Sequence, residues 1–265
     1  MSKSRLDEYL LNHHLADSLR TAQALIMSGK VFVNDQKIDK CGSPVPRNPI
    51  ITISKKKSAY VSRAGEKLAG AMASFRISPK GVIALDIGIS TGGFTDFLLQ
   101  NKASFVIGVD VSYGLTDYKI RSHEKTLLIE RTNARNLSRE VILDALIKGK
   151  NPPDLFDKIS LVVMDVSFIS VRKILPNLLE IGLKAQTYVV LIKPQFEAPK
   201  SWVDDGGVIK SPEKRAEIIE QVKSDLSPHF NIIDTCPAPI AGKKGNQEYF
   251  FLLKPKLLAG QENTE

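Results

Sequence analysis

The spacing of hydrophobic residues differs between two parts of the chain and predicts a different structure in each. In residues 1–59, apolar positions three or four apart predict short helices over 5–12 and 17–28. Two brief apolar runs then flank Asn34 and Asp35, a pair that is typical of a hairpin turn. Residues 1–59 are therefore predicted to form a small α+β domain.

Longer apolar runs begin at residue 82 and predict a second, larger domain over residues 60–265. The runs VIALDIG, SFVIGVD, LLIE, ISLVVMDV and YVVLIKP have the length of strands, and helical or loop segments separate them. Uninterrupted apolar runs are typical of strands buried on both faces, as in a parallel sheet covered by helices. Two further runs, NIIDTC and EYFFLL, predict a hairpin at the sheet edge. We therefore expect an α/β fold here.

Positive charge is concentrated at the N-terminus, because residues 1–60 carry +5 of the net charge of +8. A small basic domain beside a nearly neutral one suggests a module that binds a polyanion, attached to a catalytic domain. A basic surface without such a partner is the alternative, and charge alone does not decide between them.

The chain shows no pattern of export or membrane insertion. No stretch approaches the roughly 20 apolar residues of a membrane span, and MSKSRLDEYLLNHH lacks the hydrophobic core of a signal peptide. Cys41 and Cys236 match no metal or redox spacing, so we expect free thiols in a reducing compartment. These features predict a cytoplasmic protein.

The segment ALDIGISTGGFTDFLLQ runs from an apolar strand through a glycine-rich turn into an amphipathic helix. Such a turn directs backbone N–H groups and a helix N-terminus toward a negatively charged ligand group. The spacing lacks the GxGxxG of dinucleotide sites and the GK[ST] of a P-loop, which argues against both. Asp110 ends the next strand, about 20 residues later, where a carboxylate can accept hydrogen bonds from ribose hydroxyls.

Three polar residues lie at the ends of predicted strands. Asp165 ends ISLVVMD, Lys193 ends YVVLIK, and Glu248 lies at the start of EYFFLL. The carboxyl ends of parallel strands are where α/β proteins place their chemistry. Singly, each residue has a simpler explanation, because an aspartate there can cap the next helix and a lysine can extend into solvent.

Lys67, in the stretch YVSRAGEKL, is equally ambiguous when taken alone. Ser62 and Glu66 predict a capping box at the start of a helix, on which Lys67 either faces water or belongs to a catalytic site.

The N-terminal pattern resembles the S4-type RNA-binding module. The matching residues are RLDEYL and then SLRTAQALIMSGKVFVNDQKI. In that family, basic and polar residues of the helices and the hairpin contact RNA phosphates, which implies RNA rather than DNA as the ligand. The resemblance makes Arg5, Arg20 and Lys30 candidates for these contacts, and we add Arg63 from SRAGEKL.

The pattern D-x-G-x-S-x-G-G-F resembles the first motif of FtsJ-like methyltransferases, which have a Rossmann-like sheet and use S-adenosylmethionine. In that family the glycines let the backbone approach the methionine part of the cofactor. The later stretch RTNAR is expected near the adenine. The implied cofactor-binding residues are Asp86, Gly88, Ser90, Gly92, Gly93, Phe94, Asp110, Asn133 and Ala134.

The four polar residues together resemble the Lys-Asp-Lys-Glu tetrad of FtsJ-like ribose 2′-O-methyltransferases. The matching contexts are SRAGEKL for Lys67, VMDVSF for Asp165, LIKPQFE for Lys193 and KGNQEYF for Glu248. The resemblance implies that these four residues are catalytic.

The chemistry explains why such a mixture is needed. A ribose 2′-hydroxyl is a poor nucleophile near neutral pH, so its attack on a sulfonium methyl requires proton removal or strong polarisation. A lysine can serve as the base only if its pKa falls, and two lysines in one pocket favour the neutral amine. We expect Lys193 to be the base, Asp165 and Glu248 to orient the amines and the hydroxyl, and Lys67 to tune the electrostatic field, with no metal required.

All these motifs in one chain resemble the TlyA family, which comprises haemolysin-like proteins and rRNA 2′-O-methyltransferases that act on cytidine ribose in 16S and/or 23S rRNA. The resemblance implies rRNA in ribosomal subunits as the partner. This chain departs from the usual motifs at Ala64, where glycine is common, and at Ile89, where alanine is usual. The bulk of Ile89 bears on cofactor affinity, and the methyl of Ala64 matters only if that residue needs a positive φ.

Two other functions remain as alternatives. One is a membrane-lytic protein, as the haemolysin name suggests, and the other is a non-catalytic RNA-binding or ribosome-assembly protein. Two features are unassigned: residues 55–57 (KKK) contact RNA phosphates or form a solvated linker, and Trp202 anchors its loop or stacks on a flipped base.

Overall fold

The computed structural model describes residues 4–34, 36–53, 59–242 and 245–256. The chain forms two compact units, Met1–Lys57 and Ser58–Glu265. The lysine cluster at 55–57 lies outside the described residues.

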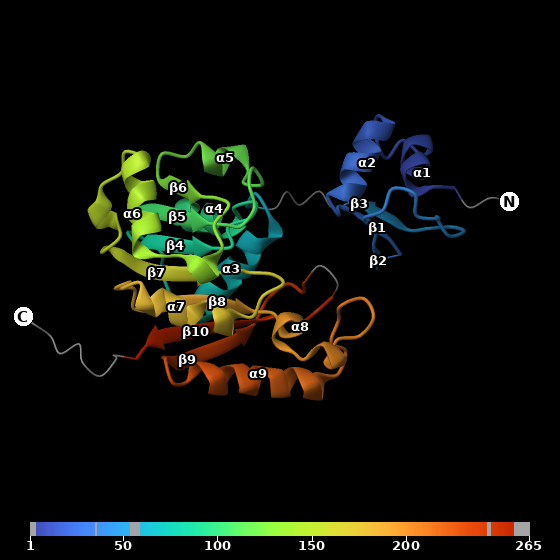
Figure 1. Cartoon of the computed structure of the whole chain (residues 1–265). Helices are drawn as coiled ribbons and strands as arrows, with labels where there is room; N and C mark the ends of the chain where they lie inside the picture. The colour runs from blue at the N-terminus through green and yellow to red at the C-terminus, as the bar shows by residue number, and fades with distance from the viewer. Residues whose placement is uncertain (1–3, 35, 54–58, 243–244, 257–265) are drawn as a thin grey trace, which may run out of the picture. The chain divides into compact units, whose positions relative to one another are not determined.

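The N-terminal unit is a pair of helices on a small antiparallel sheet (Figure 1). Its strand order is β2-β1-β3, and its core contains Leu10, Ile26 and Val31, each fully buried. The elements are α1 (Leu6–Asn12), α2 (Leu19–Met27), β1 (Val31–Val33), β2 (Gln36–Lys37) and β3 (Ile51–Ile53).

Capping and turn residues set the ends of the elements in this unit. The hydroxyl of Ser18 accepts a hydrogen bond of 3.1 Å from the backbone N–H of Thr21 and so caps α2. Gly29 ends the helix in a left-handed conformation with φ 66°. Asn34 has φ 49° at the hairpin between β1 and β2.

The C-terminal unit is built on a seven-stranded sheet in the order β6-β5-β4-β7-β8-β10-β9. Strands β4 to β8 are parallel, β10 is antiparallel to its neighbours β8 and β9, and the edge strand β9 therefore runs in the same direction as β4 to β8. The bounds are β4 (Ile83–Ile87), β5 (Phe105–Val109), β6 (Thr126–Ile129), β7 (Ile159–Met164), β8 (Thr187–Ile192), β9 (Phe230–Pro237) and β10 (Tyr249–Pro255).

Helices cover both faces of this sheet (Figure 1). The α-helices are α3 (Arg63–Ser74), α4 (Gly93–Gln100), α5 (Tyr118–Arg121), α6 (Arg139–Lys148), α7 (Leu175–Glu180), α8 (Pro194–Glu197) and α9 (Pro212–Leu226). Short 3₁₀ turns are η1 (Ala134–Asn136), η2 (Pro153–Leu155), η3 (Val171–Lys173) and η4 (Lys200–Trp202).

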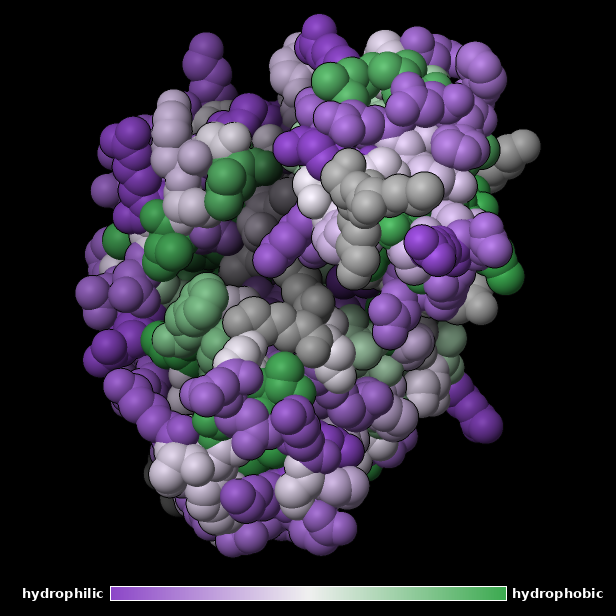
Figure 2. Space-filling view, turned by 90° about the vertical axis from the view of Figure 1, so that its right-hand side faces the viewer, coloured by the Kyte–Doolittle hydropathy of each residue, from purple (hydrophilic) through white to green (hydrophobic). Residues whose placement is uncertain are grey.

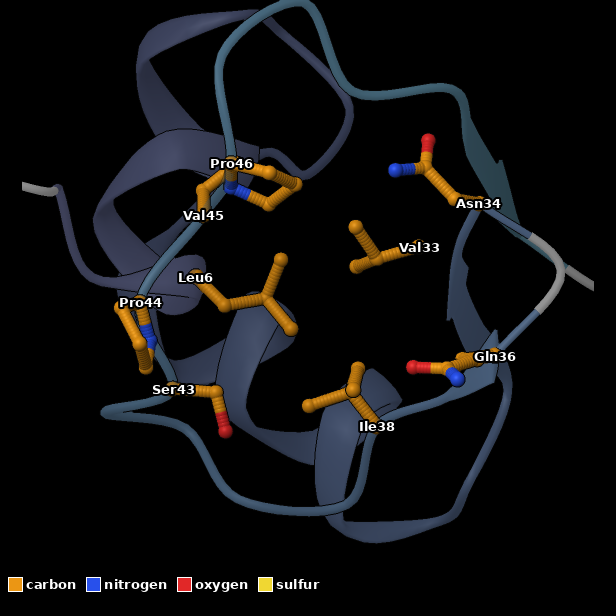
Figure 3. A pocket seen from close by; sticks show the side chains of 9 residues that line it. All are labelled: Leu6, Val33, Asn34, Gln36, Ile38, Ser43, Pro44, Val45 and Pro46. Carbon is orange, nitrogen blue, oxygen red and sulfur yellow. The ribbon is translucent and has the colours of Figure 1, made fainter.

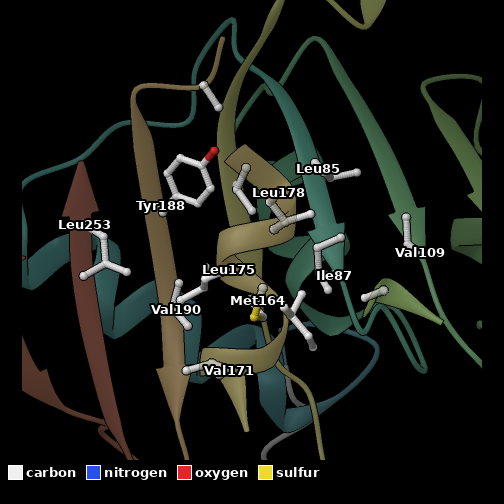
Figure 4. Packing of buried hydrophobic residues seen from close by; sticks show 14 of the residues in the cluster. Leu85, Ile87, Val109, Met164, Val171, Leu175, Leu178, Tyr188, Val190 and Leu253 are labelled. Atoms are coloured by element: carbon white, nitrogen blue, oxygen red, sulfur yellow. The ribbon is translucent and has the colours of Figure 1, made fainter. Parts of the chain in front are cut away.

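Alternate residues of each strand enter two separate cores, because successive side chains point to opposite faces. Leu85 and Ile87 pack with Leu175 and Leu178 of α7 in one core (Figure 4). Ala84 faces the other core, which α3 and α4 cover. Burial on both faces explains why these strands appear in the sequence as uninterrupted apolar runs.

The predicted α/β fold is thus confirmed, including the terminal hairpin. In this hairpin the second strand, β10, pairs with β8, and the first strand, β9, lies at the edge of the sheet. Trp202 is partly buried against the α7 side of the sheet, with the ammonium of Lys214 5.7 Å from its ring centre. These contacts support its interpretation as a loop anchor.

On the face seen in Figure 2, hydrophilic residues predominate and apolar residues form separate small patches. Among the described residues, no helix has the length and apolar character needed to cross a membrane.

Candidate active site

The candidate catalytic residues meet at the carboxyl ends of the central strands. Met164 pairs with both Ile87 of β4 and Val190 of β8, so Asp165 and Lys193 leave the sheet at the same edge. Ile192 pairs with Tyr249, which places the start of the antiparallel β10 at this edge too. The register therefore brings together residues that lie far apart in the sequence.

The four residues form two ion pairs. The Lys193 ammonium lies 2.6 Å from Asp165 Oδ1 and donates a 2.8 Å hydrogen bond to Ser167 Oγ. The Lys67 ammonium lies 2.5 Å from Glu248 Oε2. Side-chain exposures of 11% for Lys193 and 18% for Asp165 leave this pair reachable, whereas Glu248 is 4% exposed.

This pairing changes one sequence-based expectation. We expected the two lysines to act on each other as like charges, but each lysine has its own carboxylate partner. Contact between a buried ammonium and a carboxylate offsets part of the free-energy cost of removing both charged groups from water. Gly242 leaves room for this arrangement, because a Cβ there would lie 2.5 Å from Glu248 Oε1.

The glycine-rich loop packs tightly against the same edge. Gly88 has φ 84°, and a Cβ there would lie 2.5 Å from the carbonyl oxygen of Asp165. Gly92, with φ 92°, has the side chain of Ile120 where its own would be. Ser90 also has a positive φ of 48°. The glycines thus allow the loop to pack closely against the rest of the protein, in addition to any role in letting the backbone approach a ligand.

Asp86 is fully buried in β4, and one of its oxygens lacks a partner among the described residues. The hydroxyl of Thr95 donates a 2.6 Å hydrogen bond to the other oxygen. Burial raises the pKa of Asp86 to about 7, and the charge of Asp165 adds to the rise. A cationic ligand beside this carboxylate would stabilise its charge, and S-adenosylmethionine, with its ammonium and sulfonium groups, fits that requirement.

Asp110 is held at the end of β5 with one acceptor position left. Its Oδ2 accepts a 2.8 Å hydrogen bond from the Ser90 amide, and its Oδ1 accepts one of 2.8 Å from the Ser112 amide and another from the Ser112 hydroxyl. A carboxylate offers about four acceptor positions, so one remains for a ribose hydroxyl.

Asn133 lines a cavity of about 470 Å³ beside this edge, together with Val111, Ser167 and Phe168. The side-chain carbonyl of Asn133 caps η1 by accepting a hydrogen bond from the backbone amide of Arg135, and Ala134 is buried. Of the two residues predicted near the adenine, Asn133 therefore adjoins a cavity that also reaches the loop after Asp165, whereas Ala134 is not among the residues that line it.

Two predicted cofactor residues, at the start of α4, also make packing contacts within the protein. The side chain of Phe94 is 2% exposed and packs on Phe250, with ring centres 6.0 Å apart, so only its backbone can face a ligand. Gly93 faces α3, because a Cβ there would lie 2.2 Å from Ser62 Oγ. Both residues thus have a role in helix packing, and the sequence motif does not distinguish this role from contact with the cofactor.

The predicted capping box at α3 is wrong. Ser62 is the N-cap residue, but its hydroxyl makes no capping hydrogen bond and is buried without a partner in the described part of the chain. Glu66 lies four residues after the N-cap rather than three, and the close approach of Gly93 encloses the hydroxyl.

Neither motif departure disturbs the loop. Ala64 lies inside α3 and needs no positive φ. Ile89 is 3% exposed and turns into the sheet, where its Cδ1 occupies the space that a side chain at Gly108 would need. Glycine at position 108 thus accommodates the larger residue at 89.

Sequence reasoning missed the aromatic pair beside Lys193. Phe168 is 90% exposed with φ 65°, and its ring centre lies 5.0 Å from that of Phe196. The Lys193 ammonium lies 6.0 Å from the centre of the Phe196 ring. An exposed phenylalanine three residues after a strand-end aspartate is a weak signal in a sequence, because its conformation and exposure are invisible there.

The predicted RNA-contacting residues occur in both units. Arg20 and Arg63 are exposed and Lys30 is half-buried. Arg5 donates to Asp7 through Nε at 3.0 Å and Nη2 at 2.8 Å, and this bonding lowers the pKa of Asp7 to about 2. Because Asp7 is 1% exposed and Arg5 is 53% exposed, the buried acid fixes the direction of an accessible guanidinium.

A small cavity of about 150 Å³ also lies in the N-terminal unit (Figure 3). Leu6, Val33 and Val45 point into it, and Asn34 and Gln36 lie along one side. Within the described ranges, no group of three or more histidine, cysteine or acidic residues could hold a metal ion.

Comparisons with known proteins agree with this architecture. The model of the FtsJ-like methyltransferase family matches residues 60–255, and that of the S4 domain matches residues 4–50. The chain therefore belongs to the FtsJ-like methyltransferases and carries an S4 domain.

Similar proteins narrow the class. The chain is 34% identical to the 16S/23S rRNA (cytidine-2′-O)-methyltransferase TlyA of Mycobacterium tuberculosis, over 95% of this chain and 90% of that protein. It is 37% identical to Hemolysin A of Brachyspira hyodysenteriae, over 92% of this chain and 97% of that protein. A solved structure from Streptococcus thermophilus that carries a hemolysin name matches with a TM-score of 0.70 and 31% identity, over 97% of this chain and 90% of that one. Within the FtsJ-like class, the chain is a member of the TlyA family.

Proposed function

We propose that the protein is an S-adenosylmethionine-dependent 2′-O-methyltransferase that acts on the ribose of cytidine in 16S and/or 23S rRNA of ribosomal subunits. The observation that carries this proposal is the meeting of two Lys–carboxylate pairs with the glycine-rich loop at one sheet edge. The family membership and the names of the relatives support the substrate class.

The cofactor would lie along the loop at Asp86, Gly88, Ser90 and Asp110, and when bound it supplies an electrophilic methyl group. The chain's part is to present the ribose hydroxyl. Lys193, partly accessible and held by Asp165 and Ser167, is placed to take the hydroxyl proton as a new oxygen–carbon bond forms and the sulfur–carbon bond breaks. For this step Lys193 must first pass its own proton to Asp165 or to water.

The remaining residues position the reactants. Lys67 and Glu248 are the more deeply buried pair and hold α3 against the start of β10. The exposed ring of Phe168, supported by Phe196, offers a surface on which a base that has left its helix can stack. Alignment of the oxygen, methyl and sulfur accounts for much of the rate in such a transfer.

The direct test is methyl transfer to purified 30S and 50S subunits from cells that lack the gene. We expect label from S-adenosylmethionine in rRNA at a nucleotide that resists alkaline cleavage, because the methylated 2′-oxygen can no longer attack its neighbouring phosphate. Label on a base, or none despite cofactor binding by calorimetry, would contradict the proposal.

We further propose that residues 1–59 recruit the RNA through Arg5, Arg20 and Lys30. Arg5→Ala should weaken binding to subunits and reduce the slope of log affinity against log salt by roughly one unit, since one phosphate contact is lost. Asp7→Asn keeps the arginine but frees its side chain, so affinity should fall with a smaller change of slope.

The matched control for that measurement is Asp39→Asn, an equal charge change at an exposed acid of the same unit. Equal effects of the Asp7 and Asp39 variants on affinity would show that orientation of Arg5 has no role. Far-ultraviolet circular dichroism checks that each variant stays folded.

A further inference from the structure

Glu197 is a buried acid close to the candidate active site but outside the four-residue set. Its side chain is 1% exposed, and it lies in α8, four residues after Lys193. We propose that Glu197 is a positioning residue that holds residues 165–170 in the shape that sets Asp165 and Ser167 against Lys193. The inference rests on the proposed function, and its test is designed to be separable from it.

Three donors on one short stretch converge on this carboxylate. Its Oε2 accepts hydrogen bonds of 2.5 Å from the Ser170 hydroxyl and 3.1 Å from Arg172 Nε. Its Oε1 accepts a hydrogen bond of 2.9 Å from the Val171 amide. All three belong to the segment that follows β7, whereas Glu197 belongs to the segment that follows β8. Glu197 therefore ties the two loops that carry Asp165 and Lys193.

A second connection joins the same two loops from the other end. Lys193 reaches Asp165 and Ser167, and Glu197 reaches Ser170 and Val171. Lys193 and Glu197 flank one turn of helix, so the two connections bracket the loop that contains Phe168. A loop held at both ends cannot shift Ser167 without breaking one of them.

The loop needs such a restraint because its conformation is unfavourable. Phe168 has φ 65°, a region that bulky side chains rarely adopt and that persists only where the surroundings impose it. Phe168 is 90% exposed, and its ring contacts that of Phe196 with 5.0 Å between ring centres, so burial does not supply the restraint. The contacts of Glu197 with Ser170 and Val171 fix the residues that follow Phe168.

Arg172 also contacts the backbone of Glu197. Its Nη2 donates a hydrogen bond of 2.7 Å to the backbone carbonyl oxygen of Glu197, and its Nη1 donates a hydrogen bond to Asp225 of α9. Because Asp225 contacts Arg172, the control position is instead Glu220 of α9, which is 69% exposed and pairs with Lys223 at 2.7 Å.

The test variant is Glu197→Gln, which keeps the size of the side chain but replaces one acceptor oxygen with a donor that faces a donor. We expect kcat to fall by about tenfold to a hundredfold, the range that a displacement of about 1 Å can cost. The dissociation constant for S-adenosylmethionine should stay within about twofold. Amide hydrogen exchange in a peptide covering 166–173 should accelerate, while a peptide from β4 should not change.

Glu220→Gln is the matched control, since it makes the same substitution at an exposed glutamate of α9, and it should show wild-type kcat and wild-type exchange. Wild-type kcat in Glu197→Gln, or a fall in thermal stability with kcat unchanged, would overturn the inference, because either result assigns Glu197 a structural role only. If Glu197→Gln does not fold, Ser170→Ala removes one donor and should give a smaller effect in the same direction.

The exchange measurement separates this inference from the proposed function. Absence of methyl transfer by the wild-type protein would contradict the proposed function. Faster amide exchange at 166–173 in Glu197→Gln would still show that Glu197 holds the loop. Unchanged exchange there would overturn the inference whatever the activity.

Discussion

Lys193→Ala is expected to lower the rate of methyl transfer by about 10²–10⁴-fold, the contribution typical of a general base. The change removes the ammonium that contacts both Asp165 and Ser167. Single-turnover rates with saturating subunits measure the loss. Calorimetry with S-adenosylmethionine should give an unchanged dissociation constant, because the cofactor loop is built from other residues.

Lys193→Arg distinguishes a base from a positive charge. A guanidinium keeps the charge but does not give up its proton in proteins, so this variant should be as inactive as the alanine. Substantial activity in Lys193→Arg would assign the lysine an electrostatic role instead. Lys148→Ala, at an exposed position of α6, is the matched control and should retain full activity.

Glu248→Ala is expected to lower the free energy of unfolding of the C-terminal unit by about 3–5 kcal/mol. The substitution leaves the Lys67 ammonium, 10% exposed, without its carboxylate. Urea unfolding followed by the fluorescence of Trp202, the single tryptophan of the chain, reports on this unit alone.

Two further variants identify the cause. Adding Lys67→Met to Glu248→Ala removes the stranded charge and should recover part of the loss. Asp154→Ala breaks the exposed pair with Lys158, whose partners are each 60% exposed, and should cost at most about 0.5 kcal/mol. If the double variant is as unstable as Glu248→Ala, the loss comes from packing rather than from the unpaired ammonium.

The fold was predictable because its signals are local. Uninterrupted apolar runs indicate doubly buried strands, and they correspond to β4, β5, β7 and β8. The position of β10 between β8 and β9 was not predictable, since both orders of a terminal hairpin have the same hydrophobic pattern.

The site was predictable only in part. Strand-end reasoning pointed to Asp165 and Lys193, because parallel strands end at a common edge. It did not reveal which carboxylate each lysine meets, which depends on the register of β10. The role of Glu197 was missed because its partners are fixed by loop conformation. The capping box was wrong for a reason visible in the sequence, since Glu66 lies four residues after Ser62 and not three.

The place of β10 in the sheet has a consequence for synthesis of the chain. β10 follows β9 in the sequence, but it separates β9 from the rest of the sheet, and Glu248 is 181 positions beyond its partner Lys67. While residues 248–255 are still inside the ribosomal exit tunnel, β9 has no strand to join and Lys67 has no carboxylate. The glycine-rich loop can therefore form on the nascent polypeptide before the catalytic edge, which is completed only after β10 has emerged.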